Sequence, residues 1–317
     1  MGDSELKRVA IIAAMPGELL HLARGWKHEK RERGIHLWRT TQGDAEWIAA
    51  CAGAGQEAAS RALAEVEKDG PVTSVISTGW VGALSPEFVP GRVYGVAGII
   101  DARTGERFEA GEVVLANQGL PQKAGSWRSP AKGRGGTEPA KKAGEQLPSG
   151  AKAHVESGRI SGTAEAVPFQ SMPNTKPFQS MTNTKPFQSM PNIKPLMRPW
   201  LVTNPKVATA EEKRRLAATY PAGLVDMEAA AVARLAAMRR IPFFCIKAVS
   251  DGHAAHLPDF NPFLTPDGQF RLVRFLFFAL FRPWYWPALM RMSENSSKAS
   301  QALRDTLLAN LRRPGVD

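Results

Sequence analysis

Short apolar runs that alternate with helix-like segments constrain this chain more than any other feature. Before residue 102 such runs occur at 8–15 (RVAIIAAM), 46–53 (EWIAACAG), 72–77 (VTSVIS) and 91–101 (GRVYGVAGIID), and a helical pattern follows the second. After residue 199 come an extended stretch at 200–208, helices at 210–219 and 227–240, and a final apolar run at 241–251. Buried strands that alternate with helices predict an α/β domain with a largely parallel or mixed sheet.

A low-complexity segment divides this pattern. Residues 118–198 contain the tandem repeat PFQSMPNTK, PFQSMTNTK, PFQSMPNIK (168–194), preceded by a stretch rich in Gly, Pro and Lys. They show no sustained apolar period, which predicts a mostly disordered insertion. A duplication tolerated in a surface loop and a ligand for a partner protein or an acidic surface both fit it. We therefore expect one domain from 1–117 and 199–260, and a helical C-terminal extension at 261–317.

The basic character of the chain belongs to that insertion. The formal net charge is +11, and the stretch 118–199 holds twelve Lys and Arg against four Asp and Glu. The rest of the chain is close to neutral, so its charge does not indicate a nucleic-acid partner. Two cysteines, Cys51 and Cys245, give no disulfide framework, and the N-terminus lacks the apolar core of a signal peptide. These features indicate a cytoplasmic protein.

Acidic residues follow the predicted strands or begin a helix. Glu18 follows the first run, Asp226 and Glu228 stand at the start of the helix at 227–240, and Asp251 closes the last run. Strand ends converge in folds of this class, so these carboxylates are candidates for one site. Three of the four also have a structural interpretation: Asp226 as the N-cap of the helix, which we favour, Glu228 as a charge at its N-terminus, and Asp251 as part of a turn at 250–252.

Four motifs together resemble the purine nucleoside phosphorylase/nucleosidase superfamily, and most of all the 5′-methylthioadenosine/S-adenosylhomocysteine nucleosidases. They are AIIAAMPGEL (10–19), STGWVGAL (77–84), LVDMEAAAVARLA (224–236) and FFCIKAVSD (243–251), in the family's order. The resemblance implies a three-layer α/β domain with a central mixed sheet flanked by helices. It also implies cleavage of the N-glycosidic bond of an adenine nucleoside without a cofactor.

The resemblance assigns roles to particular residues. Asp251, supported by Ser250, would protonate the adenine leaving group, and Glu18 would orient or deprotonate the attacking water. Glu228 would bind the ribose hydroxyls and favour the cationic ring of the transition state, with Met227 against the ribose.

The segment TGWVGAL, which we interpret as a loop, contributes Gly79 and Trp80 to the expected substrate site. Trp80 stands where the family usually has a small residue, and AAMPGEL contains no arginine. Both features favour water over phosphate as the nucleophile. If Trp80 packs away from the site, phosphate is not excluded as the nucleophile.

Two other kinds of site are disfavoured. The Gly53/Gly55 pattern lacks a third glycine, because Ala58 follows, and the next strand ends at Ser77 without an acid, which argues against a dinucleotide cofactor. His253, His256 and Asp259 have metal-like spacing but no further ligand cluster, so we expect no metal. Their loop is expected to cover the adenine pocket.

The tail at 270–292 is apolar and aromatic, but arginines interrupt it. It fits either a closing helix buried on the sheet, which we favour, or a segment at a membrane surface, with contact through 270–290 at the inner membrane. It also resembles the C-terminal region of hopanoid-associated phosphorylases, which implies adenosylhopane as an alternative substrate. The main resemblance further implies a homodimer. A different kind of hypothesis is that the chain is a homologue without catalytic activity, in which the inserted repeat serves binding.

Overall fold

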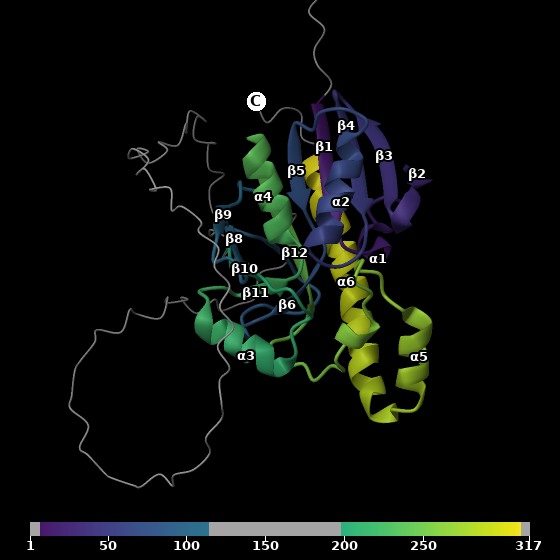
Figure 1. The fold of residues 1–317 in the computed structure, drawn as a ribbon, viewed down its shortest axis with the longest axis vertical. Coiled ribbons are helices and arrows are strands. Elements are labelled where there is room, and N and C mark those ends of the chain that lie inside the picture. The colour runs from purple at the N-terminus through teal and green to yellow at the C-terminus, as the bar shows by residue number, and fades with distance from the viewer. Residues whose placement is uncertain (1–6, 114–197, 312–317) are drawn as a thin grey trace, which may run out of the picture. The chain divides into compact units, whose positions relative to one another are not determined.

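The computed structural model describes residues 7–113 and 198–311 of the chain (Figure 1). The predicted insertion at 118–198 lies outside the described residues except for Arg198, so its disorder stays a prediction.

One mixed sheet of twelve strands forms the centre of the fold. Its order is β2-β3-β4-β1-β5-β12-β6-β11-β10-β8-β9, and β7 pairs with β12. The inner pairs β1–β4, β1–β5 and β5–β12 are parallel, whereas the edge pairs β2–β3 and β8–β9 are antiparallel. The prediction of a mixed α/β sheet is confirmed. The strands are β1 (Lys7–Ala13), β2 (Lys27–Lys30), β3 (His36–Gln42), β4 (Ala45–Cys51), β5 (Ser74–Ser77), β6 (Trp80–Ala83), β7 (Val93–Gly95), β8 (Gly98–Asp101), β9 (Arg107–Glu109), β10 (Trp200–Thr203), β11 (Leu224–Asp226) and β12 (Phe243–Asp251).

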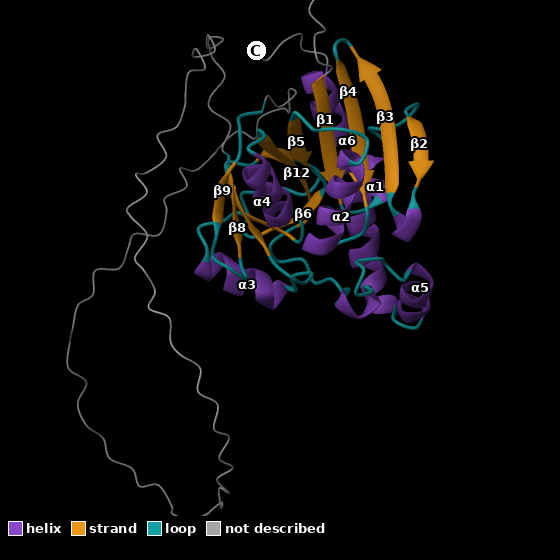
Figure 2. Cartoon of the chain, turned by 45° about the horizontal axis from the view of Figure 1, so that its top comes forward, coloured by secondary structure: helices purple, strands orange, loops and turns teal. Residues whose placement is uncertain are grey.

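Helices cover both faces of this sheet (Figure 2). They are α1 (Pro16–Leu19), α2 (Gln56–Glu67), α3 (Ala210–Thr219), α4 (Ala229–Arg239), α5 (Leu272–Leu280) and α6 (Trp286–Leu311), with short 3-10 turns at Glu32–Gly34, Asn261–Phe263 and Pro283–Tyr285. The helix predicted at 210–219 is α3, and a capping box between Thr209 and Glu212 fixes its start.

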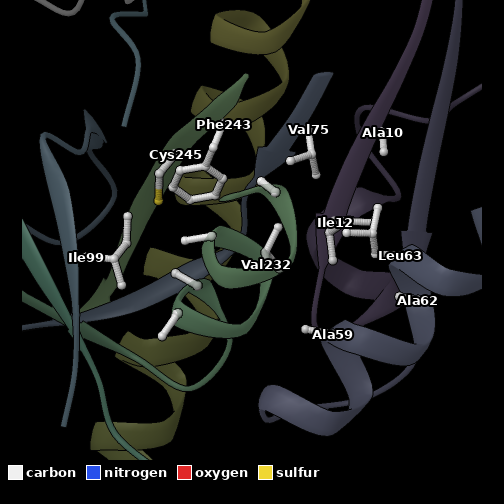
Figure 3. Close-up of a cluster of buried hydrophobic side chains, with 14 of the residues drawn as sticks. Ala10, Ile12, Ala59, Ala62, Leu63, Val75, Ile99, Val232, Phe243 and Cys245 are labelled. Atoms are coloured by element: carbon white, nitrogen blue, oxygen red, sulfur yellow. The ribbon is translucent and has the colours of Figure 1, made fainter. Parts of the chain in front are cut away.

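The apolar residues of β1, at 9–13, are buried on both faces of the sheet. Ala10 and Ile12 point into a cluster with residues of α2 and α4 (Figure 3). Ile11 belongs to a second cluster, which includes Leu303 and Leu307 of α6. Because successive side chains of a strand point to opposite faces, burial on both faces requires a continuous apolar run rather than an alternating one.

Two strand predictions differ from the structure. The run at 91–101 is divided into β7 and β8, because the chain leaves β12 at Val96, whose N–H donates to the Cys245 carbonyl, and joins Pro199 through the N–H of Ala97. The segment TGWVGAL, interpreted as a loop, contains the strand β6.

The tail also differs from the interpretation that we favoured. The helix that packs on the sheet is the second half of α6, through Ala299, Leu303 and Leu307, all C-terminal to 270–292. Residues 270–292 instead form α5 and the start of α6, which extend beyond the sheet as a helical hairpin (Figure 1). Among the described helices, none is long and apolar enough to cross a membrane.

Candidate active site

A cavity of about 790 Å³ opens beside the strand ends and brings most of the predicted residues together. Its lining includes six of the seven predicted site residues: Glu18, Trp80, Met227, Glu228, Ser250 and Asp251. They come from α1, β6, the junction of β11 with α4, and the end of β12. The seventh, Gly79, does not line the cavity but lies directly behind Glu18.

Backbone N–H groups hold the Glu18 carboxylate in place. The N–H groups of Ala14 (2.8 Å) and Met15 (2.9 Å) donate to Oε2, and the N–H of Trp80 (2.7 Å) donates to Oε1. The residue is 5% exposed. Burial raises the pKa of Glu18 above its ordinary value, although these N–H groups and the charge of Lys247 act in the opposite direction. A fixed carboxylate with a raised pKa is suited to accept a proton from water.

Gly79 makes this arrangement sterically accessible. Its φ is +117°, a conformation that residues with a side chain rarely adopt. A Cβ at this position would also lie 2.8 Å from Oε1 of Glu18. Gly79 therefore supports the site by giving Glu18 room, and the adjacent N–H of Trp80 completes the contact.

A second carboxylate faces the cavity at the start of α4. Glu228 Oε1 accepts a hydrogen bond from the N–H of Gly55 (2.8 Å), and Oε2 accepts one from the N–H of Met227 (3.2 Å). Burial raises the pKa of Glu228 to about 8, and the charge of Asp226 adds to the shift, while Lys247 opposes it. Glu228 is thus poised to change charge when a cationic group enters the cavity.

Asp226 is not the N-cap that we favoured. It ends β11, and Glu228 occupies the N-cap position of α4 without a side-chain capping bond. The Asp226 carboxylate instead accepts hydrogen bonds from Ala229 N (3.0 Å) and Thr203 Oγ1 (2.7 Å), and Lys247 Nζ lies 2.9 Å from Oδ2. Asp226 therefore links the start of the helix to a buried cation below the site.

Lys247 is the largest fully buried side chain of the described residues. Its ammonium also donates to the carbonyl of Thr78 (2.9 Å). Burial lowers the pKa of Lys247, but the carboxylates of Asp226 and Glu228 outweigh it, so the pKa is raised overall and the side chain is charged. Sequence reasoning did not identify Lys247, although a single lysine inside the apolar run FFCIKAVSD was a usable signal, because a buried lysine needs a partner.

The cavity is also lined by the Ser250–Asp251 pair at the end of β12. Ser250 Oγ donates to Asp251 Oδ1 (2.7 Å), and Lys213 of α3 forms an ion pair with Oδ2 and donates to the carbonyl of Gly252 (2.9 Å). Lys213 is 3% exposed. The sequence did not indicate Lys213 either. The pattern of α3 is that of an ordinary polar helix, in which nothing distinguishes this lysine from its exposed neighbours.

Trp80 lines the cavity rather than packing away from it. Its indole lies over Gly17, and Nε1 donates to Ser300 Oγ of α6 (3.1 Å). The loop after β12 also contributes to the lining through Ala255, Leu257 and Asp259, whereas His253 and His256 are exposed. No group of three His, Cys, Asp or Glu side chains is placed to hold a metal ion in the part of the chain that the structure describes.

Comparison with known proteins supports the same family. The family model described as Phosphorylase superfamily matches residues 8–265. No curated protein matches the chain.

Solved structures share the fold at low sequence identity. They include Arabidopsis thaliana 5′-methylthioadenosine nucleosidase (14% identity, TM-score 0.55, 98% of each chain covered) and Helicobacter pylori 5′-methylthioadenosine/S-adenosyl homocysteine nucleosidase (10%, 0.54, 96% of this chain and 98% of that one). Futalosine hydrolase of Helicobacter pylori is similar to the same degree (11%, 0.53, 96% and 97%). The resemblance drawn from the four motifs is confirmed at this level: the chain belongs to the phosphorylase superfamily.

Proposed function

We propose that this protein hydrolyses the N-glycosidic bond of an adenine nucleoside that carries a thioether or another 5′ group. The observation that carries the proposal is the division of three carboxylates around one cavity. Glu18 comes from α1, Glu228 from the start of α4, and Asp251 from the end of β12, where it lies beside Ser250 and Lys213. Three carboxylates from separate elements around one cavity suit two proton-transfer roles and one binding role on a single substrate.

In the proposed reaction the bond between C1′ and the adenine nitrogen breaks, and its electron pair stays on the base. Asp251, in its protonated form, donates its proton to the base and becomes a carboxylate, which the ammonium of Lys213 and the hydroxyl of Ser250 then stabilise. Glu18 takes a proton from water as the water oxygen bonds to C1′. Glu228 binds the ribose hydroxyls and, when charged, favours the cationic sugar ring of the transition state, with Met227 against its apolar side. The products are adenine and the free sugar.

The lining of the cavity supports water rather than phosphate as the nucleophile. A phosphate group is commonly bound by arginine forks. Among the described residues that line the cavity there is no arginine, and its two lysines are Lys206 and Lys213, of which Lys213 is already paired with Asp251.

A second candidate substrate is an adenine nucleoside with a large apolar 5′ group, such as adenosylhopane. It is favoured by the part of the same cavity that α5 and α6 line with apolar side chains: Leu272, Phe275, Leu276, Leu289 and Met292. A methylthio group would leave much of this surface in contact with water, whereas a long hydrocarbon would cover it.

The test measures adenine release by purified full-length protein from methylthioadenosine and from adenosine with a long 5′-alkyl chain. Asp251→Asn should slow release at least ~100-fold while the protein stays folded. Asp305→Asn on the outer surface of α6 is the matched control and should leave the rate unchanged. Unchanged turnover in Asp251→Asn would remove the leaving-group assignment. A higher kcat/KM for the alkyl nucleoside would select the second candidate.

A further inference from the structure

The helical hairpin of residues 271–292 exposes an unusual amount of apolar surface. Of the twelve large apolar side chains that are exposed in the described residues, nine lie on it: Leu272, Val273, Leu276, Phe277, Leu280, Phe281, Trp284, Trp286 and Met290. Phe281 is 73% exposed and Val273 is 68% exposed. Contiguous apolar patches of this kind mark interaction sites in soluble proteins. We call these nine residues the hairpin face.

The charged side chains of the hairpin itself are all positive. Arg271, Arg274, Arg282 and Arg291 lie within or beside it, and the sequence from Gly268 to Ser293 contains no Asp or Glu. The guanidinium of Arg282 lies 4.1 Å from the centre of the Phe278 ring, which holds it at the apolar surface. Apolar side chains with a rim of arginines complement a surface that is apolar inside and anionic outside.

We propose that the hairpin face docks this protein on the surface of an anionic lipid bilayer. Trp284, Tyr285 and Trp286 follow one another at the turn of the hairpin, and these aromatic rings favour the headgroup level of a bilayer. The arginines would lie against anionic headgroups, each adding about 1 kcal/mol to binding, or about fivefold in affinity. The helices lie on the membrane and do not cross it.

The charges of the hairpin make a second copy of this chain less suited than an anionic bilayer to cover the hairpin face. In a symmetric dimer the same patch meets itself, so the arginines of one copy would approach those of the other with no acidic residue on either hairpin to offset them. A bilayer offers negative charge and hydrocarbon together.

The hairpin face is continuous with the candidate active site. Leu272 and Leu276 are exposed and also line the cavity, and the buried Phe275 and Ala279 line it from the inner side of α5. A docked molecule would therefore have an apolar path from the lipid to the three carboxylates. This path depends on the proposed function, whereas docking itself does not.

The test is co-sedimentation of the full chain with vesicles of phosphatidylglycerol and phosphatidylcholine, and with phosphatidylcholine alone. We expect binding to the anionic vesicles that weakens with salt, and a blue shift of tryptophan fluorescence on binding. Phe277→Ser/Phe281→Ser should weaken binding at least tenfold. Arg274→Glu/Arg291→Glu should weaken it at least twentyfold, from about fivefold for each arginine.

Matched controls separate the hairpin face from other surfaces. Met238→Ser removes an exposed apolar side chain of α4, and Arg215→Glu reverses a charge on α3; both should bind as the wild type does. The basic segment 118–198 is intact in every variant, so anionic vesicles that bind Phe277→Ser/Phe281→Ser as tightly as the wild type would overturn the proposal. Absence of binding by the wild type would overturn it too, as would light scattering that shows a dimer which this double variant dissociates. Adenine release measured on the same variants with a short, soluble nucleoside distinguishes failure of docking from failure of the proposed function.

Discussion

Lys247→Met removes the buried cation below the candidate site, and the structure indicates how much this costs. Lys247 is 1% exposed and Asp226 is fully buried, with 2.9 Å between Nζ and Oδ2. Deleting one partner of such a pair leaves a buried charge uncompensated, which lowers the free energy of unfolding by about 3–5 kcal/mol. In a domain of roughly 150–250 residues this corresponds to a fall in Tm of ~6–20 °C.

Urea denaturation followed by circular dichroism measures this loss, with thermal unfolding as a second readout. Lys68→Met is the control, since Lys68 is 68% exposed in its side chain and pairs with Glu65 on the surface, where an ion pair contributes less than ~1 kcal/mol. The double variant Lys247→Met/Asp226→Asn removes both charges and should recover more than half of the lost stability.

Two results would refute this reasoning. One is a loss of less than ~1 kcal/mol in Lys247→Met, which would mean that the cation is not needed to compensate Asp226. The other is a double variant as unstable as the sum of the two single variants, because residues in contact should show a clear interaction energy.

Three further predictions concern the carboxylates. Glu18→Gln should lower kcat at least ~100-fold in the adenine-release assay while circular dichroism stays unchanged; wild-type turnover would exclude Glu18 as the base. Gly79→Ala should lower the free energy of unfolding, measured by urea denaturation, by more than ~1 kcal/mol, because φ at this position is positive and the added Cβ would meet Glu18. Gly105→Ala is the control, since Gly105 also has a positive φ but its Cβ would meet no neighbour. Equal losses of stability in the two variants would show that Glu18 is not involved. Because the pKa of Glu228 is raised from 4.5 to about 8, the folded state holds this proton more tightly than the unfolded state does. Stability should therefore fall as pH rises from about 4.5 to about 8, less steeply in Glu228→Gln, and identical slopes in the two proteins would contradict the shift.

The sequence allowed much of the fold to be predicted, since buried strands and helices carry strong apolar patterns. The strands β1, β4, β5 and β12 and the helices α2 and α3 occur where those patterns indicated. The hairpin β2–β3 was missed because its first strand, KHEK, lies at the edge of the sheet and is mostly exposed, so it has no apolar period. Edge strands are specified by pairing with a neighbour more than by local sequence.

The acidic residues of the candidate site could be predicted from the sequence, but its buried lysines could not. Glu18, Glu228 and Asp251 stand in recognisable motifs, and the structure gathers them around one cavity. Lys213 and Lys247 depend on contacts across the fold, with Asp251 thirty-eight residues from Lys213 along the chain. The position of the helical hairpin at 271–292 likewise depends on how α6 packs on the sheet, and no local sequence pattern reveals that packing.

Adenine release from methylthioadenosine, measured with and without phosphate, distinguishes hydrolysis from phosphorolysis. We expect adenine and a free sugar in phosphate-free buffer, at a rate that added phosphate leaves unchanged. Release that strictly requires phosphate and yields a sugar 1-phosphate would contradict water as the nucleophile. No release from methylthioadenosine or from a 5′-alkyl adenosine, by a protein shown to be folded, would contradict the proposed activity itself.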